Sequence, residues 1–328
     1  MSRRSLGLVI AAFVVTRLVT AWLAVDGETY GAVTGDTVLY EAWADRMVEQ
    51  GQVPYSDFSI EYPPGSLPLI ALPKAIPNEA LSYRTGFVWL MVLVDAAGLV
   101  GLLLLARRWG SELGPWLWVA LIPLLGPITY LRLDLAPAVA TVWAIERGSV
   151  RRWGWTGALL MFAAIAKIYA LLLLPAALWV ASDRRRFLLG AAAMALPLLL
   201  LGPALDDSVR TLVEYHGERG IQIESLWGSF LLIAIRRGVD AYIVGSFGAL
   251  HLFGDLTGPI KLAGLLASVA ALCAGTWLAA RFVPRGDARQ LAGAAFVILA
   301  LVLAVGTVLS PQFLMWIFAP AAAALCAP

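Results

Sequence analysis

The chain has few of the residues from which metal sites, disulfide frameworks and nucleic-acid surfaces are built. Its 328 residues include two cysteines and two histidines, only 14% are charged, and the formal net charge is +2. Both cysteines, Cys273 and Cys326, lie in apolar runs, and neither His216 nor His251 has a metal-ligand partner at helical spacing. We therefore expect no zinc site and no disulfide framework, and the small net charge gives no reason to expect a nucleic-acid partner.

Motifs typical of soluble enzymes are also missing, and long hydrophobic runs take their place. The sequence contains no P-loop, no Rossmann glycine pattern at a strand–helix junction and no Ser-His-Asp motif. Hydrophobic residues make up 60% of the chain, and several runs reach the roughly 20 residues that a helix needs to cross a bilayer. The first run follows Arg3 and Arg4 and is long enough to span, so we expect an uncleaved helix there. These features predict an all-α polytopic membrane protein.

The positions of lysine and arginine predict how the chain is oriented in the membrane. Short loops rich in these residues stay in the cytoplasm. Placing the basic clusters at residues 3–4, 107–108, 147–152, 184–186 and 281–289 inside gives one consistent path. This path has about ten transmembrane helices, several of them short or broken, and both termini are cytoplasmic. It treats residues 1–328 as a single membrane domain, with outside segments at about 26–85 and 205–258. The helices are expected at about 6–25, 86–106, 113–130, 134–146, a pair within 153–181, 187–204, 259–280, 290–308 and 313–327.

Some of the expected helices are too short to cross the membrane alone. Residues 134–146 and the two halves of 153–181 give helices of roughly 13–14 residues, well below the length of a full span. Broken backbone at membrane depth is tolerated where it lines a water-filled cavity. Arg132 and Asp134 lie at the start of one short helix, and Lys167 lies at the junction of the other two. We therefore expect an outward-facing polar recess lined by these residues.

The first outside segment carries the leading candidate for chemistry. Residues 36–50 have the spacing of an amphipathic helix, with Val38 and Trp43 on its apolar side. Asp36 is in an N-cap-like position, so its carboxylate has either a capping role, a catalytic role or both. The tyrosines and carboxylates that follow are either substrate ligands or parts of a solvated interfacial loop. The candidate substrate-binding residues of this segment are Tyr40, Tyr55, Asp57, Glu61 and Tyr62.

The second outside segment gathers polar groups within a dozen residues, between 214 and 225. The planar guanidinium of Arg219 suits a pair of phosphate oxygens, and the neighbouring His216, Gln222 and Glu224 are candidates for binding an anion or sugar hydroxyls. A polar juxtamembrane loop is the alternative interpretation. Gln312 is a further candidate, because the turn that interrupts the last apolar hairpin requires a proline but not a glutamine.

Two charges, Arg17 and Asp95, fall inside expected membrane helices. Charges in hydrocarbon are costly and are usually either functional or paired. Arg17 and Asp95 are expected either to pair with each other or to bind backbone carbonyls. Lys167, at a helix break, is the better candidate to face a bound phosphate.

Taken with these residues, the chain resembles the GT-C glycosyltransferases, and more narrowly the actinobacterial polyprenol-phosphate-mannose-dependent α-1,2-mannosyltransferases. The resemblance covers most of the chain, although the chain is short for that family. It rests on Gly35-Asp36, Gly51-x-x-Pro54-Tyr55, Glu61-Tyr62-Pro63-Pro64, Lys167 before an apolar Leu-Pro run, and Ser310-Pro311-Gln312.

The resemblance implies a GT-C-like fold in the cell membrane and an enzyme that transfers a sugar, by this resemblance mannose, with inversion. The donor would be a polyprenyl-phosphate sugar, and the acceptor a glycolipid or polysaccharide of the cell envelope. Asp36 would act as general base, and the donor phosphate would be bound by Lys167, Arg132, Arg219 and His216. No cofactor is implied, and the lack of a tight DxD pair in the first outside segment favours metal-independent transfer. A divalent metal held by Asp57 and Glu61 is the alternative.

A transporter or flippase for a lipid-linked sugar is the alternative function, because broken helices and intramembrane charges would suit it as well. The concentration of polar residues on one face favours the enzyme, since alternating access needs gates on both faces.

Overall fold

The computed structural model describes residues 2–26, 35–76, 81–201, 204–246 and 248–328. The helices are α1 (Arg3–Asp26), α2 (Gly35–Val48), α3 (Leu67–Ala75), α4 (Tyr83–Trp109), α5 (Leu113–Leu124), α6 (Leu135–Ser149), α7 (Trp153–Ala166), α8 (Leu174–Val180), α9 (Arg184–Ala195), α10 (Ala204–Glu218), α11 (Leu226–Ile235), α12 (Thr257–Phe282), α13 (Ala288–Val305) and α14 (Leu314–Ala324). Short 3-10 turns lie between them: η2 (Pro64–Ser66), η3 (Gly126–Thr129), η4 (Ile168–Leu173), η5 (Leu196–Leu201) and η6 (Pro311–Phe313). The strands are β1 (Ile221–Gln222), β2 (Ala241–Ser246) and β3 (Ala249–Gly254).

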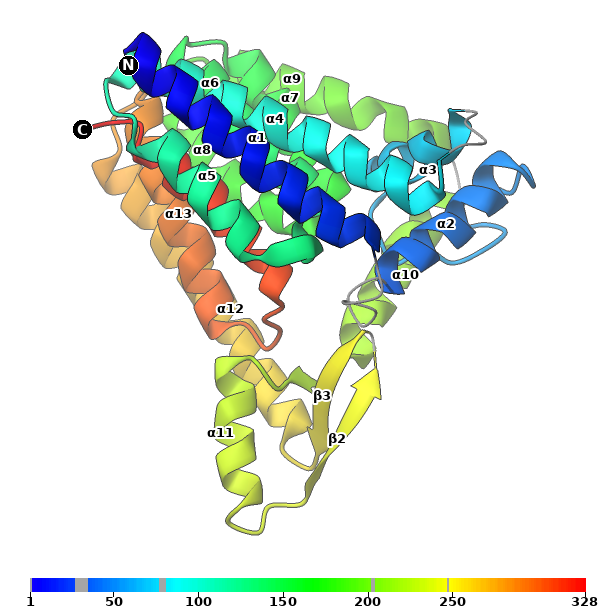
Figure 1. The fold of residues 1–328 in the computed structure, drawn as a ribbon. Helices are drawn as coiled ribbons and strands as arrows, with labels where there is room; N and C mark the ends of the chain where they lie inside the picture. Colours follow the sequence, from blue (N-terminus) through cyan, green and yellow to red (C-terminus); the bar gives the residue numbers. More distant parts are fainter. Residues whose placement is uncertain (1, 27–34, 77–80, 202–203, 247) are drawn as a thin grey trace.

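The helices form a bundle from which two groups of elements extend. The two chain ends lie close together at one end of the bundle, while α11 and the strands lie at the far end of the α12–α13 pair (Figure 1). Helices α2, α3 and α10 lie together on another side of the molecule (Figure 1). The described chain contains four helices that are long and apolar enough to cross a membrane, namely α1, α4, α12 and α13. The chain is therefore a membrane protein, and the count of about ten spans stays a prediction.

The predicted helix breaks are confirmed. Helix α7 ends at Ala166, and Lys167 has an extended backbone before η4 begins. Helix α6 begins directly after Asp134, and the whole turn from Tyr130 to Asp134 is buried. Charged side chains at both breaks therefore enter the interior of the bundle.

Close packing of α7 against α9 fixes the helix that leads to Lys167. A Cβ at Gly157 would collide with the carbonyl of Phe187, and a Cβ at Gly190 would collide with the carbonyl of Gly154. Small residues at such positions let two helix backbones approach closely within a membrane, where van der Waals packing is a main source of helix association. Glycine is therefore required on both sides of this contact.

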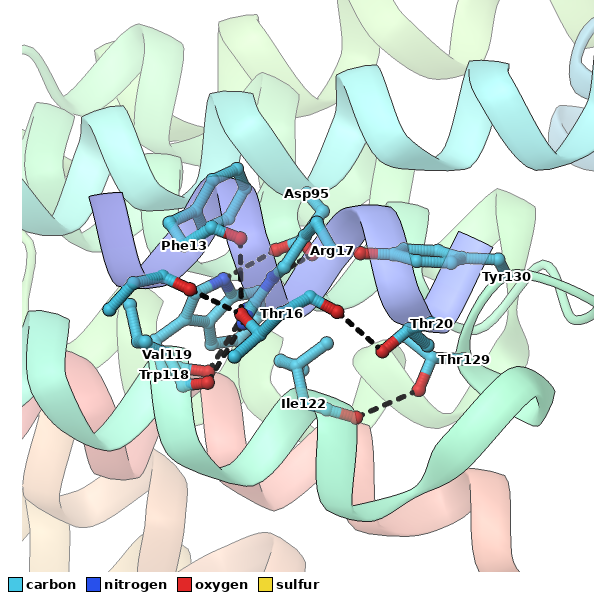
Figure 2. Close-up of polar contacts among 11 residues, drawn as sticks. Phe13, Thr16, Arg17, Thr20, Asp95, Trp118, Val119, Ile122, Thr129 and Tyr130 are labelled. Atoms are coloured by element: carbon cyan, nitrogen blue, oxygen red, sulfur yellow. Dashed lines mark hydrogen bonds and ion pairs between the residues drawn. The ribbon is translucent and has the colours of Figure 1, made fainter. Parts of the chain in front are cut away.

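The two intramembrane charges are paired, as one of the alternatives predicts. Arg17 on α1 donates from Nε to Asp95 on α4 at 2.9 Å, and both side chains are almost completely buried (Figure 2). The guanidinium also donates to backbone carbonyls of α5. The cost of two charges in the bundle is thus offset by mutual attraction and by hydrogen bonds.

A small sheet supplements the predicted all-α fold. The strand order is β1-β3-β2, and both pairings are antiparallel. The apolar run Tyr242–Val244 gives β2 its β-forming residues, and Gly248, with φ +69°, supplies the turn conformation between the two long strands. The sequence predicts only an outside segment here, because the two longer strands have just six residues each.

Helix α2 differs from its prediction in two respects. It begins at Gly35, so Asp36 lies in its first turn instead of at the N-cap. Val38, which is predicted on the apolar side, is 59% exposed, whereas Tyr40 is completely buried. The reason is the packing of Tyr40 against Tyr62 and Phe87, which rotates the apolar side of α2 toward these aromatic rings.

Candidate active site

A cavity of about 420 Å³ lies where the predicted polar segments meet. Its walls come from α2, the loop before η2, the two helix breaks, α10, the β2–β3 turn and the segment before α14. The polar side chains that line it and that the sequence analysis names are Asp36, Glu61, Tyr62, Arg132, Lys167, Arg219 and Gln312. The structure therefore brings together groups from distant parts of the chain around one space.

Asp36 presents a partly exposed carboxylate to this cavity. It forms an ion pair with Arg132, whose side chain is buried. The hydroxyls of Tyr62 and Tyr40 lie 3.4 and 3.5 Å from the same oxygen, which are long contacts. The first turn of a helix is also a favourable place for a negative charge, because the unpaired N–H groups point toward it. The carboxylate is thus held firmly while 27% of its side chain stays accessible.

The arginines supply unused hydrogen-bond donors. Among the described residues, the buried Nε atoms of Arg132 and Arg219 have no hydrogen-bond partner. Both residues line the cavity, so a ligand with anionic oxygens would satisfy these groups. A buried donor without a partner is costly, which makes binding of such a ligand favourable.

Lys167 completes the cationic group from the break between α7 and η4. Its Nζ lies 3.4 Å from Asp134 Oδ2 and 4.3 Å from the centre of the Tyr62 ring. Asp134 is completely buried and accepts a second hydrogen bond from Trp316 Nε1 at 2.7 Å. Asp134 therefore holds two residues of the cavity wall from behind and does not line the cavity itself.

Glu61 and Tyr215 connect the first outside segment to α10. Burial raises the pKa of the Glu61 carboxyl, while the charges of Lys167 and Arg219 and a hydrogen bond from Tyr215 act in the opposite direction. Burial, with the nearby Glu61 charge, raises the pKa of Tyr215 to about 12. Tyr215 is not among the residues that the sequence predicts. It lies in the last turn of α10, four residues before Arg219, which directly follows the helix. This spacing is the signal that could have found it.

Aromatic rings also contribute to the cavity wall, and the sequence does not predict them. The rings of Tyr169 and Trp316 stack with centroids 3.9 Å apart, and Phe313 stacks on Trp316 at 4.0 Å. Phe313 and Trp316 line the cavity beside Gln312, whose Oε1 accepts a hydrogen bond from Ser310. Because these aromatic residues lie in apolar runs of the sequence, their composition alone does not distinguish them from lipid-facing residues.

Three predicted substrate ligands of the first segment have structural contacts instead. Tyr55 is buried, and its hydroxyl donates to the backbone carbonyl of Tyr62 at 2.7 Å. Asp57 accepts a hydrogen bond from the Val53 N–H at 2.7 Å within its own turn. Tyr40 is also buried, beneath Asp36, and shares a hydrogen bond of 2.9 Å with the Tyr62 hydroxyl. None of these three side chains lines the cavity, which corrects the expectation of direct contact.

Some predicted ligands of the second outside segment also lie outside the cavity wall. Gln222 is buried in β1, and its side-chain oxygen accepts from the Leu309 N–H at 3.1 Å. Glu224 is exposed and lies outside the cavity wall. His216 belongs to α10, but its side chain is outside the part of the structure that is described. Among the described residues, no group of three His, Cys, Asp or Glu side chains is placed to hold a metal ion.

This helical membrane protein has a carboxylate and three cations around one cavity. Such a site is expected in a membrane enzyme that transfers a group from an anionic donor. The model of glycosyltransferase family 87 matches residues 60–311, which is most of the chain. The chain therefore belongs to glycosyltransferase family 87, a family of the GT-C type, and it is a membrane glycosyltransferase. No curated protein and no solved structure matches the chain.

Proposed function

We propose that this chain transfers mannose, with inversion, from a polyprenyl-phosphate donor to a glycolipid or polysaccharide acceptor of the cell envelope. The observation that carries the proposal is the position of Asp36 beside Arg132, Lys167 and Arg219 around one cavity. Asp36 has a partly exposed carboxylate that is suited to take a proton, and the group of cations is suited to hold a phosphate. The resemblance described above suggests mannose as the sugar.

In this mechanism the acceptor hydroxyl oxygen attacks the anomeric carbon from the side opposite the leaving phosphate. The bond from this carbon to the phosphate oxygen breaks, and its electron pair stays on the phosphate. Asp36 takes the hydroxyl proton as the new bond forms, which typically contributes about 10²–10⁴-fold to the rate. Arg132, Lys167 and Arg219 stabilise the negative charge that develops on the leaving group.

The remaining wall suits the sugar and the acceptor. Tyr62, Glu61 and Gln312 offer hydroxyl, carboxyl and amide groups for sugar hydroxyls. Phe313 and Trp316 offer apolar surface beside them. We place this reaction on the outer face of the cell membrane, with both termini cytoplasmic, because the arginine clusters at residues 3–4, 107–108, 147–152, 184–186 and 281–289 then lie inside.

The test is formation of a glycosidic bond by the purified protein in detergent. The protein would be incubated with a radiolabelled polyprenyl-phosphate mannose and a panel of mannose-containing lipids and oligosaccharides, and products would be identified by mass spectrometry. A mannosylated product with inverted anomeric configuration is expected. Transfer of a different sugar from a matched panel of donors would overturn mannose, and a retained configuration would overturn inversion.

A transporter or flippase finds no support in the family match. Detergent removes the two compartments that transport needs, so bond formation there can only be catalysis. If no donor of the panel reacted, and lipid-linked sugar crossed the bilayer in proteoliposomes that contain the protein, the transporter would replace the enzyme.

A further inference from the structure

Four buried side chains form one hydrogen-bonded group away from the cavity. The group consists of Arg17 on α1, Asp95 on α4, Trp118 on α5 and Tyr130 in the turn after η3 (Figure 2). Arg17 is 2% exposed and the other three are completely buried. None of the four lines the cavity, so the proposed reaction makes no direct use of them.

Asp95 is the centre of this group. One carboxylate oxygen accepts from Arg17 Nε at 2.9 Å and from the Tyr130 hydroxyl at 2.6 Å. The other oxygen accepts from Trp118 Nε1 at 2.6 Å. The guanidinium of Arg17 donates further to the carbonyls of Val119 and Trp118, at 2.8 and 3.1 Å. The carboxylate thus ties α1, α4 and α5 to the turn after η3.

This turn carries Arg132, which lines the cavity, and Asp134, which holds two residues of the cavity wall from behind. Tyr130 is followed two residues later by Arg132, which pairs with Asp36. Two residues after that comes Asp134, which holds Lys167 and Trp316. The turn is buried throughout, so a hydrogen bond to Tyr130 restrains the position of the backbone from which Arg132 extends.

We propose that Asp95 and Tyr130 are positioning residues, which set the place of Arg132 relative to the donor phosphate. This inference rests on the proposed function, because it assumes that Arg132 binds a phosphate. The four buried side chains make directional contacts, whereas an apolar core of the same volume could hold the helices together without fixing one turn. The ionic group therefore specifies a geometry in addition to joining helices.

The test compares Tyr130→Phe with a matched control, Tyr83→Phe. Tyr83 is also buried, and its hydroxyl donates a single hydrogen bond of 2.9 Å to the carbonyl of Ile70, away from the turn. Binding of farnesyl phosphate, a short lipid monophosphate, would be measured in detergent by calorimetry for the wild type and for both variants. The melting temperature of each protein would be recorded beside it.

A positioning role predicts that Tyr130→Phe weakens the binding of farnesyl phosphate about fivefold or more. Tyr83→Phe should bind it like the wild type. The two variants should melt at similar temperatures. The effect should also depend on Arg132, so Tyr130→Phe should add little to the loss already caused by Arg132→Gln. The coupling between the two substitutions is a readout that a purely structural role would not change.

The outcomes separate this inference from the proposed function. If Arg132→Gln weakens binding but Tyr130→Phe leaves it unchanged, or if the two losses simply add, Tyr130 does not act through Arg132 and the inference is overturned. If Arg132→Gln leaves binding unchanged, the phosphate-binding role of Arg132 fails, and the inference falls with it.

Discussion

Asp36 and Arg132 form an ion pair across the cavity, although one lies in the first turn of α2 and the other precedes α6. A candidate base and a candidate phosphate ligand are therefore in direct contact before any substrate is bound. The attraction between the two charges helps to offset the free-energy cost of removing each of them from water.

Replacing Asp36 with asparagine should abolish turnover while the fold persists. The amide keeps the size of the side chain but cannot take a proton, so the rate should fall by about 10²–10⁴-fold. The measurement is product formation in detergent beside a thermal melt. The control is Glu49→Gln, a carboxylate of the same segment that pairs with Lys74 outside the cavity. Near-normal turnover by Asp36→Asn would remove this residue from the mechanism.

Replacing Lys167 with methionine should have two effects that a second substitution separates. It removes a candidate phosphate ligand, and it also leaves the buried carboxylate of Asp134 without its cation, at a cost on the order of 3–5 kcal/mol. The double variant Lys167→Met/Asp134→Asn should recover much of the melting temperature without recovering the affinity for farnesyl phosphate. Recovery of both would mean that Lys167 serves only the stability of the protein.

The stability of the protein should depend on pH through Glu61. Burial raises the pKa of Glu61 in the folded state, so the folded protein holds this proton to a higher pH than the unfolded chain does. The stability that the protonated Glu61 carboxyl contributes is fully present below the pKa of the unfolded chain. It is lost as the pH rises through the pKa of the folded protein. Unfolding measured between about pH 4.5 and 7.5 should therefore show Glu61→Gln gaining stability relative to the wild type as pH rises. If the difference in stability between Glu61→Gln and the wild type did not change with pH, the raised pKa of Glu61 would be contradicted.

Close contact of α7 and α9 predicts opposite effects for two glycine substitutions. Gly190→Ala should destabilise the protein by roughly 1–3 kcal/mol, because the new methyl group would collide with the backbone of α7. Gly293→Ala, in α13, meets no atom within 4 Å and should stabilise its helix by up to about 1 kcal/mol. Thermal melts in detergent check both, and equal effects would contradict the packing described here.

The proposed orientation can be tested by labelling single cysteines in intact cells, after Cys273 and Cys326 are replaced by alanine. Cysteines at Ser56 and Gly217 should react with an impermeant thiol reagent. A cysteine at Val150, a residue that is 37% exposed, should react only after the membrane is made permeable. The reverse pattern would place the cavity on the cytoplasmic face.

The sequence predicts the cationic side of the site because charge at a helix break is conspicuous in an apolar chain. Arg132 and Lys167 stand at the ends of helices too short to span, and the structure brings both to the cavity. The pairing of Arg17 with Asp95 follows from the cost of leaving either charge alone.

Other parts of the site depend on tertiary contacts that no local pattern encodes. Phe313 and Trp316 belong to an apolar run in which cavity-facing and lipid-facing residues have the same composition. Asp134 and Gln222 are predicted as substrate ligands because they are polar, yet each is buried and bound to a distant partner, Trp316 for the first and Leu309 for the second. The direction in which such a side chain points is decided by packing, not by residue type.

The buried Gln222 joins two parts of the chain that are 87 residues apart in the sequence. Its backbone N–H donates to the Thr307 carbonyl at 3.0 Å, and its side chain accepts from Leu309. Gln222 thus ties the segment that holds α11 and the strands to the residues after α13. The turn between α11 and β2, with the exposed Arg237 and Gly238, lies at the far end of this segment (Figure 1). A small rigid domain inserted at this exposed turn would leave the contacts of Gln222 unchanged. The turn therefore offers an attachment point for a fiducial marker in electron microscopy.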